Sequence, residues 1–136
     1  NADTHLVSAD QWLDATETTL RVGRMDIVIR HVGPAHTAED LVVFVPQRSV
    51  LFAGDLVFRG RIPFVGQADS RQWIASLSRL IDFKPTLLIP GHGPVSDRPL
   101  ADLELTRDYL AFLRQTMAEA AANLGRGLRQ GGLVAL

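Results

Sequence analysis

The sequence predicts an α/β domain in which one β-sheet has helices packed on one of its faces. Short runs rich in β-branched and aromatic residues predict strands. Two longer segments show the apolar period of amphipathic helices. The order is four strands, a helix, a strand and a helix, which is typical of a layered α/β arrangement. A chain of 136 residues has room for one such domain.

Five strands are expected. The first two are separated by Gly23-Arg24, which indicates a hairpin with a tight turn. The third and fourth are separated by Pro-Gln-Arg and form a second expected hairpin; both are almost continuously apolar, as expected of strands covered on both faces. The predicted strands span residues 18–22, 25–32, 41–45, 49–53 and 86–90.

Two helices are expected, each with one apolar stripe. Ser70 can cap the first, and Lys84-Pro85 ends it. The second opens at Asp97 and Pro99 and runs to residue 124, and the Gly-rich tail, residues 125–136, is predicted to be disordered. The stripes comprise Trp73, Ile74, Leu77, Leu80 and Ile81 in the first helix, and Leu100, Leu103, Leu110, Leu113, Met117, Ala120 and Leu124 in the second.

Composition excludes several classes of protein. The net charge of −1, with 46% hydrophobic and 21% charged residues, describes an ordinary soluble domain. No basic stripe suggests nucleic acid, and no apolar run approaches the roughly 20 residues that span a bilayer. The chain has no cysteine, so it has no disulfide, thiolate ligand or cysteine nucleophile. Cytoplasmic and periplasmic locations stay open.

Asp55 is unusual because it stands between two apolar runs, in VLFAGDLVF. A charge in a buried strand is costly unless it is paired or coordinated. His36, in Gly-Pro-Ala-His-Thr, and His92, in Pro-Gly-His-Gly, also follow strands directly, and glycines flank or precede each of the three residues. Strand-to-loop junctions are the usual place for ligands at the edge of a sheet.

Imidazole and carboxylate are ligands of zinc and similar divalent ions. Asp55 alone can equally be a residue that caps a turn through backbone N–H groups. His36 and His92, taken singly, are more often incidental loop residues than ligands. The three together, in matching settings, favour a metal site.

The segments GPAHTAEDLVVFVPQRSVLFAGDLVF and LLIPGHGPV resemble the second half of the metallo-β-lactamase-fold hydrolase superfamily. The resemblance covers about residues 20–96, and residues 97–124 fit the closing helix of that family. It implies that residues 1–124 form the C-terminal half of an αββα sandwich. The aspartate at position 55 is more similar to the broad glyoxalase II-like hydrolase group than to zinc β-lactamases with cysteine there.

This resemblance implies two divalent metal ions, with zinc expected and iron or manganese as alternatives. His36 would bind the first ion, His92 the second, and Asp55 would bridge them, while Thr37 would make a supporting hydrogen bond. A hydroxide held between the ions would attack a carbonyl, ester, thioester, lactam or phosphoester centre of a small-molecule substrate.

One departure from the family is large. Its leading His-x-His-x-Asp-His motif, which supplies further metal ligands, is absent here. We therefore expect a fragment of a metal-dependent hydrolase, with a natural half as the alternative. We expect this chain by itself to be inactive and to bind metal weakly or not at all. Its expected partners are the missing N-terminal half or a second copy bound through the exposed sheet face. The rival function is a non-catalytic binding or assembly module.

Arg59, Arg61 and Phe64 follow Asp55 in a loop where a substrate could lie. Surface solubility or local packing explains these three residues equally well. Trp12 and Trp73 are expected to be core residues rather than binding platforms.

Two further expectations concern residues outside the metal site. A structural role is expected for His31 in its strand, whereas His5, near the terminus, is expected to be solvated. Glu39 and Asp40 are expected to form a turn before a strand.

Overall fold

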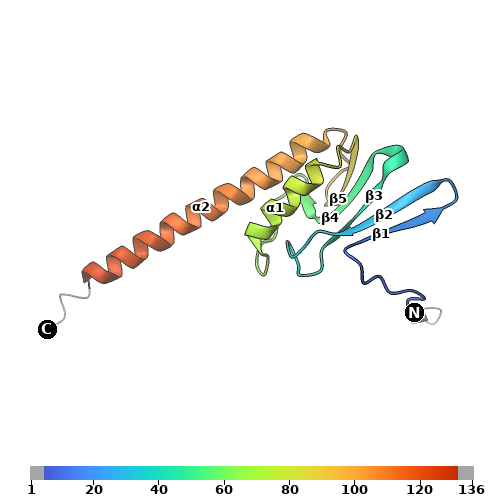
Figure 1. Cartoon of the computed structure of the whole chain (residues 1–136). Coiled ribbons are helices and arrows are strands. Elements are labelled where there is room, and N and C mark those ends of the chain that lie inside the picture. The colour runs from blue at the N-terminus through green and yellow to red at the C-terminus, as the bar shows by residue number, and fades with distance from the viewer. Residues whose placement is uncertain (1–4, 132–136) are drawn as a thin grey trace.

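A computed structural model describes residues 5–131. It confirms an α/β fold: one five-stranded sheet in the order β1-β2-β3-β4-β5, with two helices on one of its faces (Figure 1). The elements are β1 (Glu17–Val22), β2 (Met25–His31), β3 (Leu41–Val45), the short helix η1 (Pro46–Arg48), β4 (Val50–Phe58), α1 (Ser70–Ile81), β5 (Leu87–His92) and α2 (Pro99–Gly131).

Both predicted hairpins are present. β1 and β2 pair antiparallel, and Val22 lies opposite Met25 across a turn in which Gly23 has a φ of 60°. β3 and β4 pair antiparallel across η1, with Val45 opposite Val50. β2 and β3 are also antiparallel neighbours, so the first four strands form a meander.

β4 and β5 are parallel, and α1 belongs to the connection between them. Leu51 lies beside Leu88, so the carboxyl ends of the two strands reach the same edge of the sheet. β4 does not end at residue 53 as the sequence suggested. Its register shifts near Gly54, which has a φ of 52°, and pairing resumes as far as Phe58 and His92. A bulge disrupts strand pairing only locally. The apolar residues beyond it, Leu56, Val57 and Phe58, therefore remain in the strand.

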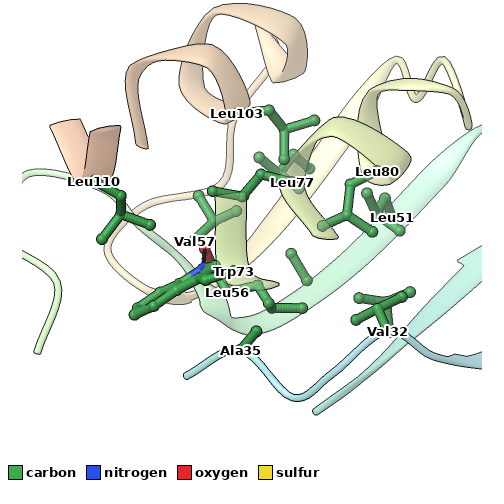
Figure 2. Packing of buried hydrophobic residues seen from close by; sticks show 13 residues of the cluster. Val32, Ala35, Leu51, Leu56, Val57, Trp73, Leu77, Leu80, Leu103 and Leu110 are labelled. Carbon is green, nitrogen blue, oxygen red and sulfur yellow. Dashed lines mark hydrogen bonds between the residues drawn. The ribbon is translucent and has the colours of Figure 1, made fainter. Parts of the chain in front are cut away.

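The core lies between the sheet and the two helices (Figure 2). Trp73 of α1 is at its centre: its ring is fully buried and its indole Nε1 donates to the carbonyl oxygen of Leu56 at 3.0 Å. A buried indole needs such a partner. The expectation for Trp12 is wrong, because its side chain is 87% exposed in a segment that joins no helix or strand. The fully buried large side chains include Leu51, Leu56, Leu77, Leu80, Leu88, Leu103 and Leu110.

The opposite face of the sheet is open within this chain. Alternation along a strand sends Val42 and Leu51 into the core and their neighbours Leu41 and Phe52 to the other face. Leu41 is 52% exposed and Phe52 is 41% exposed. The expectation that β3 and β4 are covered on both faces is therefore not met by the residues described. An apolar sheet face of this kind is typical of a surface that another layer covers.

The cap of α1 differs from the expectation. Asp69, and not Ser70, is the N-cap residue, and its carboxylate accepts hydrogen bonds from the backbone N–H groups of Arg71 and Gln72 at 3.1 and 3.0 Å. The Ser70 hydroxyl accepts a hydrogen bond from Arg114 of α2 instead. Asp is as good a capping residue as Ser, so local sequence leaves the choice open.

α2 extends beyond the predicted boundary, since it continues from residue 124 to Gly131. The predicted disorder of residues 125–131 is therefore wrong, because single glycines weaken a helix by only about 1 kcal/mol and do not end it. Residues 132–136 of the expected tail lie outside the described residues. The apolar stripe is buried at Leu103 and Leu110, whereas Met117 and Leu124 are exposed where the helix projects from the domain (Figure 1). Within residues 5–131, no helix combines the length and apolar character that crossing a membrane requires.

The N-cap of α1 gives a test of the fold. Asp69→Ala removes the acceptor of two backbone N–H groups, and we expect it to lower the free energy of unfolding by about 1 kcal/mol. Urea denaturation followed by Trp73 fluorescence measures the effect. Asp82→Ala, at the exposed C-cap of the same helix, is the matched control. Equal losses in the two variants would contradict the assignment of the cap.

Candidate metal centre

The parallel pair β4–β5 places Asp55 at the sheet edge. Gly91 of β5 lies directly against it: a Cβ at residue 91 would overlap Asp55 Oδ1 and lie 2.6 Å from the Gly54 carbonyl carbon. Only glycine lets the two strands approach this closely. The Asp55 carboxylate is therefore held at the edge, with 42% of the side chain exposed.

His92 is the last residue of β5 and not, as expected, a residue of the following loop. Its imidazole stacks on Phe58 at the end of β4, with 4.7 Å between ring centroids and 23° between ring planes. Its carbonyl oxygen accepts the backbone N–H of Arg59 at 2.9 Å. The ring is thus oriented by the sheet, and His92 Nε2 lies 3.5 Å from Asp55 Oδ1.

His36 lies in the loop between β2 and β3, and α1 holds this loop. The Asp69 backbone N–H donates to the carbonyl oxygen of Ala35 at 2.9 Å, and the buried Ser76 hydroxyl donates to that of Val32. The imidazole packs edge-on against Trp73 with 5.3 Å between centroids, and only 15% of the His36 side chain is exposed.

The turn after His36 is closed by its own side chains. Thr37 donates from its backbone N–H and its hydroxyl to the two oxygens of the Asp40 carboxylate, at 2.7 and 2.9 Å. The Asp40 carbonyl oxygen accepts from the backbone N–H groups of Val32 and Gly33. Asp40 therefore forms the turn that the sequence suggested, and Thr37 makes a hydrogen bond that supports the His36 loop.

The Asp55 carboxylate lies between the two histidines. His36 Nε2 is 3.7 Å from Asp55 Oδ2, and His92 Nε2 is 3.5 Å from Asp55 Oδ1. Two ligand atoms about 2.0–2.1 Å from one tetrahedral zinc ion are roughly 3.3 Å apart, so each nitrogen–oxygen pair is near the spacing for a shared ion. Each imidazole faces a different carboxylate oxygen, so Asp55 lies where one carboxylate would contact an ion beside each histidine.

The two ring nitrogens of His36 have different surroundings. Nε2 is the one that approaches Asp55, whereas Nδ1 is buried without a hydrogen-bond partner, a state that is rare in native proteins. Within residues 5–131, no group of three or more His, Cys, Asp or Glu side chains is placed to hold an ion. The structure brings together two nitrogen–oxygen pairs, each made of one imidazole and one oxygen of Asp55.

The residues suggested for a substrate loop differ in their contacts and exposure. Arg59 is occupied by local packing, because its guanidinium bonds to the carbonyl oxygens of Pro94 and Val95 and pairs with Asp102. Of the explanations that the sequence left open for Arg59, local packing is therefore the one that fits its contacts. Phe64 is 69% exposed and lies beside His36, with 6.5 Å between ring centroids.

Arg61 is exposed and lines a surface groove of about 270 Å³ with Ile62 and Tyr109. A substrate role for Arg61 and Phe64 stays a prediction. His31 lies outside the site: its Nε2 is 3.4 Å from the carbonyl oxygen of Ala38 and 3.8 Å from the Glu39 carboxylate. His5 is exposed, as expected.

Sequence reasoning missed the aromatic wall of the site. Phe58 contacts both imidazoles, with 5.7 Å between centroids to His36 and 4.7 Å to His92. The available signal was the place of Phe58 in an apolar run, three residues after Asp55. It was overlooked because the strand was predicted to end at residue 53. The contact between His36 and Trp73 needed the tertiary structure, because 37 positions separate the two residues in the sequence.

The fold and the site together define a class of protein: a layered α/β domain with histidine and carboxylate side chains gathered at one sheet edge. A family model described as the metallo-beta-lactamase superfamily matches residues 6–92. The chain belongs to this superfamily.

Curated relatives support the same family. The chain is 28% identical over 121 residues to a linear primary-alkylsulfatase of Pseudomonas sp., which covers 82% of this chain and 22% of the relative. It is 33% identical over 88 residues to a metallo-beta-lactamase type 2 of Bacillus cereus, covering 61% of this chain and 34% of the relative. The chain thus spans about a third or less of the length of these relatives.

Solved structures agree with the fold. A metallo-beta-lactamase from Pontibacter korlensis superimposes with a TM-score of 0.64 and 31% sequence identity, over 71% of this chain and 46% of that protein. The DIM-1 metallo-beta-lactamase superimposes with a TM-score of 0.66 and 28% identity, over 77% and 50%. This chain therefore corresponds to about half of each structure.

The contact between Gly91 and Asp55 can be tested directly. Gly91→Ala places a methyl group where the Asp55 carboxylate and the Gly54 backbone lie, so we expect Asp55 to move away from His92 and Zn²⁺ affinity to fall. Isothermal titration calorimetry measures the affinity. Gly23→Ala is the control, because residue 23 has a strained φ of 60° but nothing within 4 Å of the added atom. Wild-type affinity in Gly91→Ala would overturn this reading of the glycine.

Proposed function

We propose that this chain supplies one part of the dinuclear centre of a metal-dependent hydrolase. The observation that carries the proposal is the position of Asp55, whose two carboxylate oxygens each lie near a different imidazole. His36 would hold the first divalent ion, His92 the second, and Asp55 both. Homologues in the superfamily are hydrolases, among them a sulfatase and lactamases by name, which supports hydrolysis as the reaction class.

Bound divalent ions of this kind activate water at neutral pH and polarise the group under attack. The chain's own residues prepare the site for them. Asp55 supplies negative charge between two neutral ligands, and Phe58 and Trp73 hold the imidazoles in fixed planes. Their apolar rings also lower the local dielectric, which strengthens electrostatic interactions at the site. Zinc fits two imidazoles and a carboxylate, and iron and manganese accept the same set.

The centre needs further ligands. One imidazole and one carboxylate oxygen per ion fall short of the three protein ligands typical of a catalytic zinc site. We infer that residues outside His36, Asp55 and His92 complete it, carried by a second layer that packs on the open sheet face at Leu41 and Phe52. An N-terminal half of the same domain is the proposed layer, and a second copy of this chain is the alternative. The 136-residue chain by itself is then inactive.

The substrate is proposed only by class, since the fold hosts many hydrolytic reactions. A small molecule with a carbonyl, ester, thioester, lactam or phosphoester centre fits the proposed chemistry, and the name of the alkylsulfatase relative adds a sulfate ester. Phe64, exposed beside His36, is the proposed apolar contact for such a molecule.

Metal binding by the purified chain tests the proposed ligands. Zn²⁺ is titrated while the imidazole signals of the histidines are followed by NMR. We expect both His36 and His92 to respond, and both to lose the response in Asp55→Ala because that carboxylate is shared. His31→Ala is the control and leaves both responses intact. An unchanged response in Asp55→Ala would exclude a bridging carboxylate.

Activity assays separate the enzyme from the rival binding module. With Zn²⁺ present, we expect this chain to hydrolyse neither p-nitrophenyl acetate, p-nitrophenyl sulfate nor a chromogenic lactam above the buffer rate. A longer protein that contains this chain is expected to hydrolyse at least one of them, and His92→Ala in it is expected to abolish that rate. Metal-dependent hydrolysis by the 136-residue chain would contradict its inactivity, and a His92→Ala protein with full activity would contradict the ligand assignment.

A further inference from the structure

The Arg59 side chain joins the segments that surround the end of β5. Its Nη1 donates to the carbonyl oxygens of Pro94 at 2.9 Å and Val95 at 2.6 Å. Its Nε lies 2.8 Å from Asp102 Oδ2 in the first turn of α2. Its backbone N–H donates to the carbonyl oxygen of His92. One residue thus connects β4, the His92 segment and α2.

The Arg59–Asp102 ion pair is largely shielded from water, because 19% of the Arg59 side chain and 16% of the Asp102 side chain are exposed. Salt and solvent screen such a pair less than a surface pair. A planar guanidinium can bind two carbonyl oxygens and a carboxylate at once, whereas a lysine ammonium has no such fork. The position therefore requires arginine and not only a positive charge.

Asp102 is itself anchored to the loop that follows His92. It accepts a hydrogen bond from the Ser96 hydroxyl, and the Ser96 oxygen accepts the backbone N–H of Arg98 at 3.0 Å. Ser96 and Leu88 exchange backbone hydrogen bonds of 2.8 and 2.9 Å. The loop consequently returns to the strand that it left, and His92 lies inside the closed segment.

Gly93 marks the closest approach between this loop and Arg59. A Cβ at residue 93 would overlap the Arg59 carbonyl oxygen and lie 2.8 Å from the Arg59 Cβ, and the φ of Gly93 is +96°. The Arg59 backbone contacts Gly93, and the Arg59 guanidinium binds the carbonyl oxygens of Pro94 and Val95. The residues after His92 therefore have little room to move.

We propose that the Arg59–Asp102 pair is a positioning device for His92. It fixes residues 93–96 to α2, and through them the plane of the His92 imidazole on Phe58 and its direction toward Asp55. His36 is held separately, by Asp69 and Ser76 of α1, so the pair acts on one histidine and not on the other. The link to metal binding rests on the proposed function, whereas the link to imidazole orientation does not.

A measurement without metal tests the orientation. The ring protons of His92 are shifted by the stacked Phe58 ring in the NMR spectrum. In Arg59→Lys and in Asp102→Asn we expect the His92 signals to move toward the values of an unstacked imidazole, while those of His36 stay in place. Arg21→Lys is the matched control, since Arg21 pairs with Asp26 in the distant β1–β2 hairpin, and it should move neither set.

A second measurement concerns the metal. Zn²⁺ titration followed through the same signals should show affinity at His92 about tenfold weaker in Arg59→Lys, which is the lower range for loss of a group that orients a ligand. Affinity at His36 should be unchanged. Leu80→Val, a core substitution in α1, controls for a general loss of stability and is expected to leave both affinities unchanged.

The outcomes separate the two proposals. If the wild-type chain does not bind Zn²⁺, the proposed function fails, and the metal-free spectra still decide the role of Arg59. If the chain binds Zn²⁺ but Arg59→Lys and Asp102→Asn leave the His92 signals and affinity unchanged, positioning is overturned. Equal movement of His36 and His92 signals would also overturn it, because it would show general loosening.

Discussion

The close packing of β4 against β5 at Gly54 and Gly91 is the constraint on which the site depends. A side chain at residue 91 would occupy the end of β5, but Gly91 leaves space there that the Asp55 carboxylate fills. The bulge at Gly54 turns that carboxylate to the sheet edge while the apolar residues after it continue into the core. Without these two glycines, Asp55 could not lie between two imidazoles.

The two helices give this edge its rigidity, and each serves a different loop. α1 holds the His36 loop through Asp69, Ser76 and the ring of Trp73. α2 holds the His92 segment through Asp102 and the guanidinium of Arg59. Because both helices pack on the same core, the distance between the two imidazoles is set by core packing and not by loop conformation. Side chains supported in this way are held in a fixed arrangement, as the proposed metal site requires.

Much of the fold was readable from local patterns. Alternating and continuous apolar runs predicted the strands, and Gly23 predicted the first turn, because these signals depend on neighbours in the sequence. Other features were missed for a physical reason. Asp69 and Ser70 are equivalent as caps until Arg114 of α2 takes the serine hydroxyl. Trp12 has a large aromatic side chain of the kind that cores contain, but nothing in the described chain covers it.

The sequence by itself determined which side chains form the candidate site: it singled out His36, Asp55 and His92, each with a glycine nearby, and it carried the family resemblance of their motifs. Only the tertiary structure decided how they meet. The parallel register of β4 and β5 brings Asp55 beside His92, and the loop between β2 and β3 brings His36 to the same carboxylate. The role of Arg59 follows from contacts with residues 35 to 43 positions away. Local sequence patterns cannot specify such contacts, because they depend on how the whole core packs.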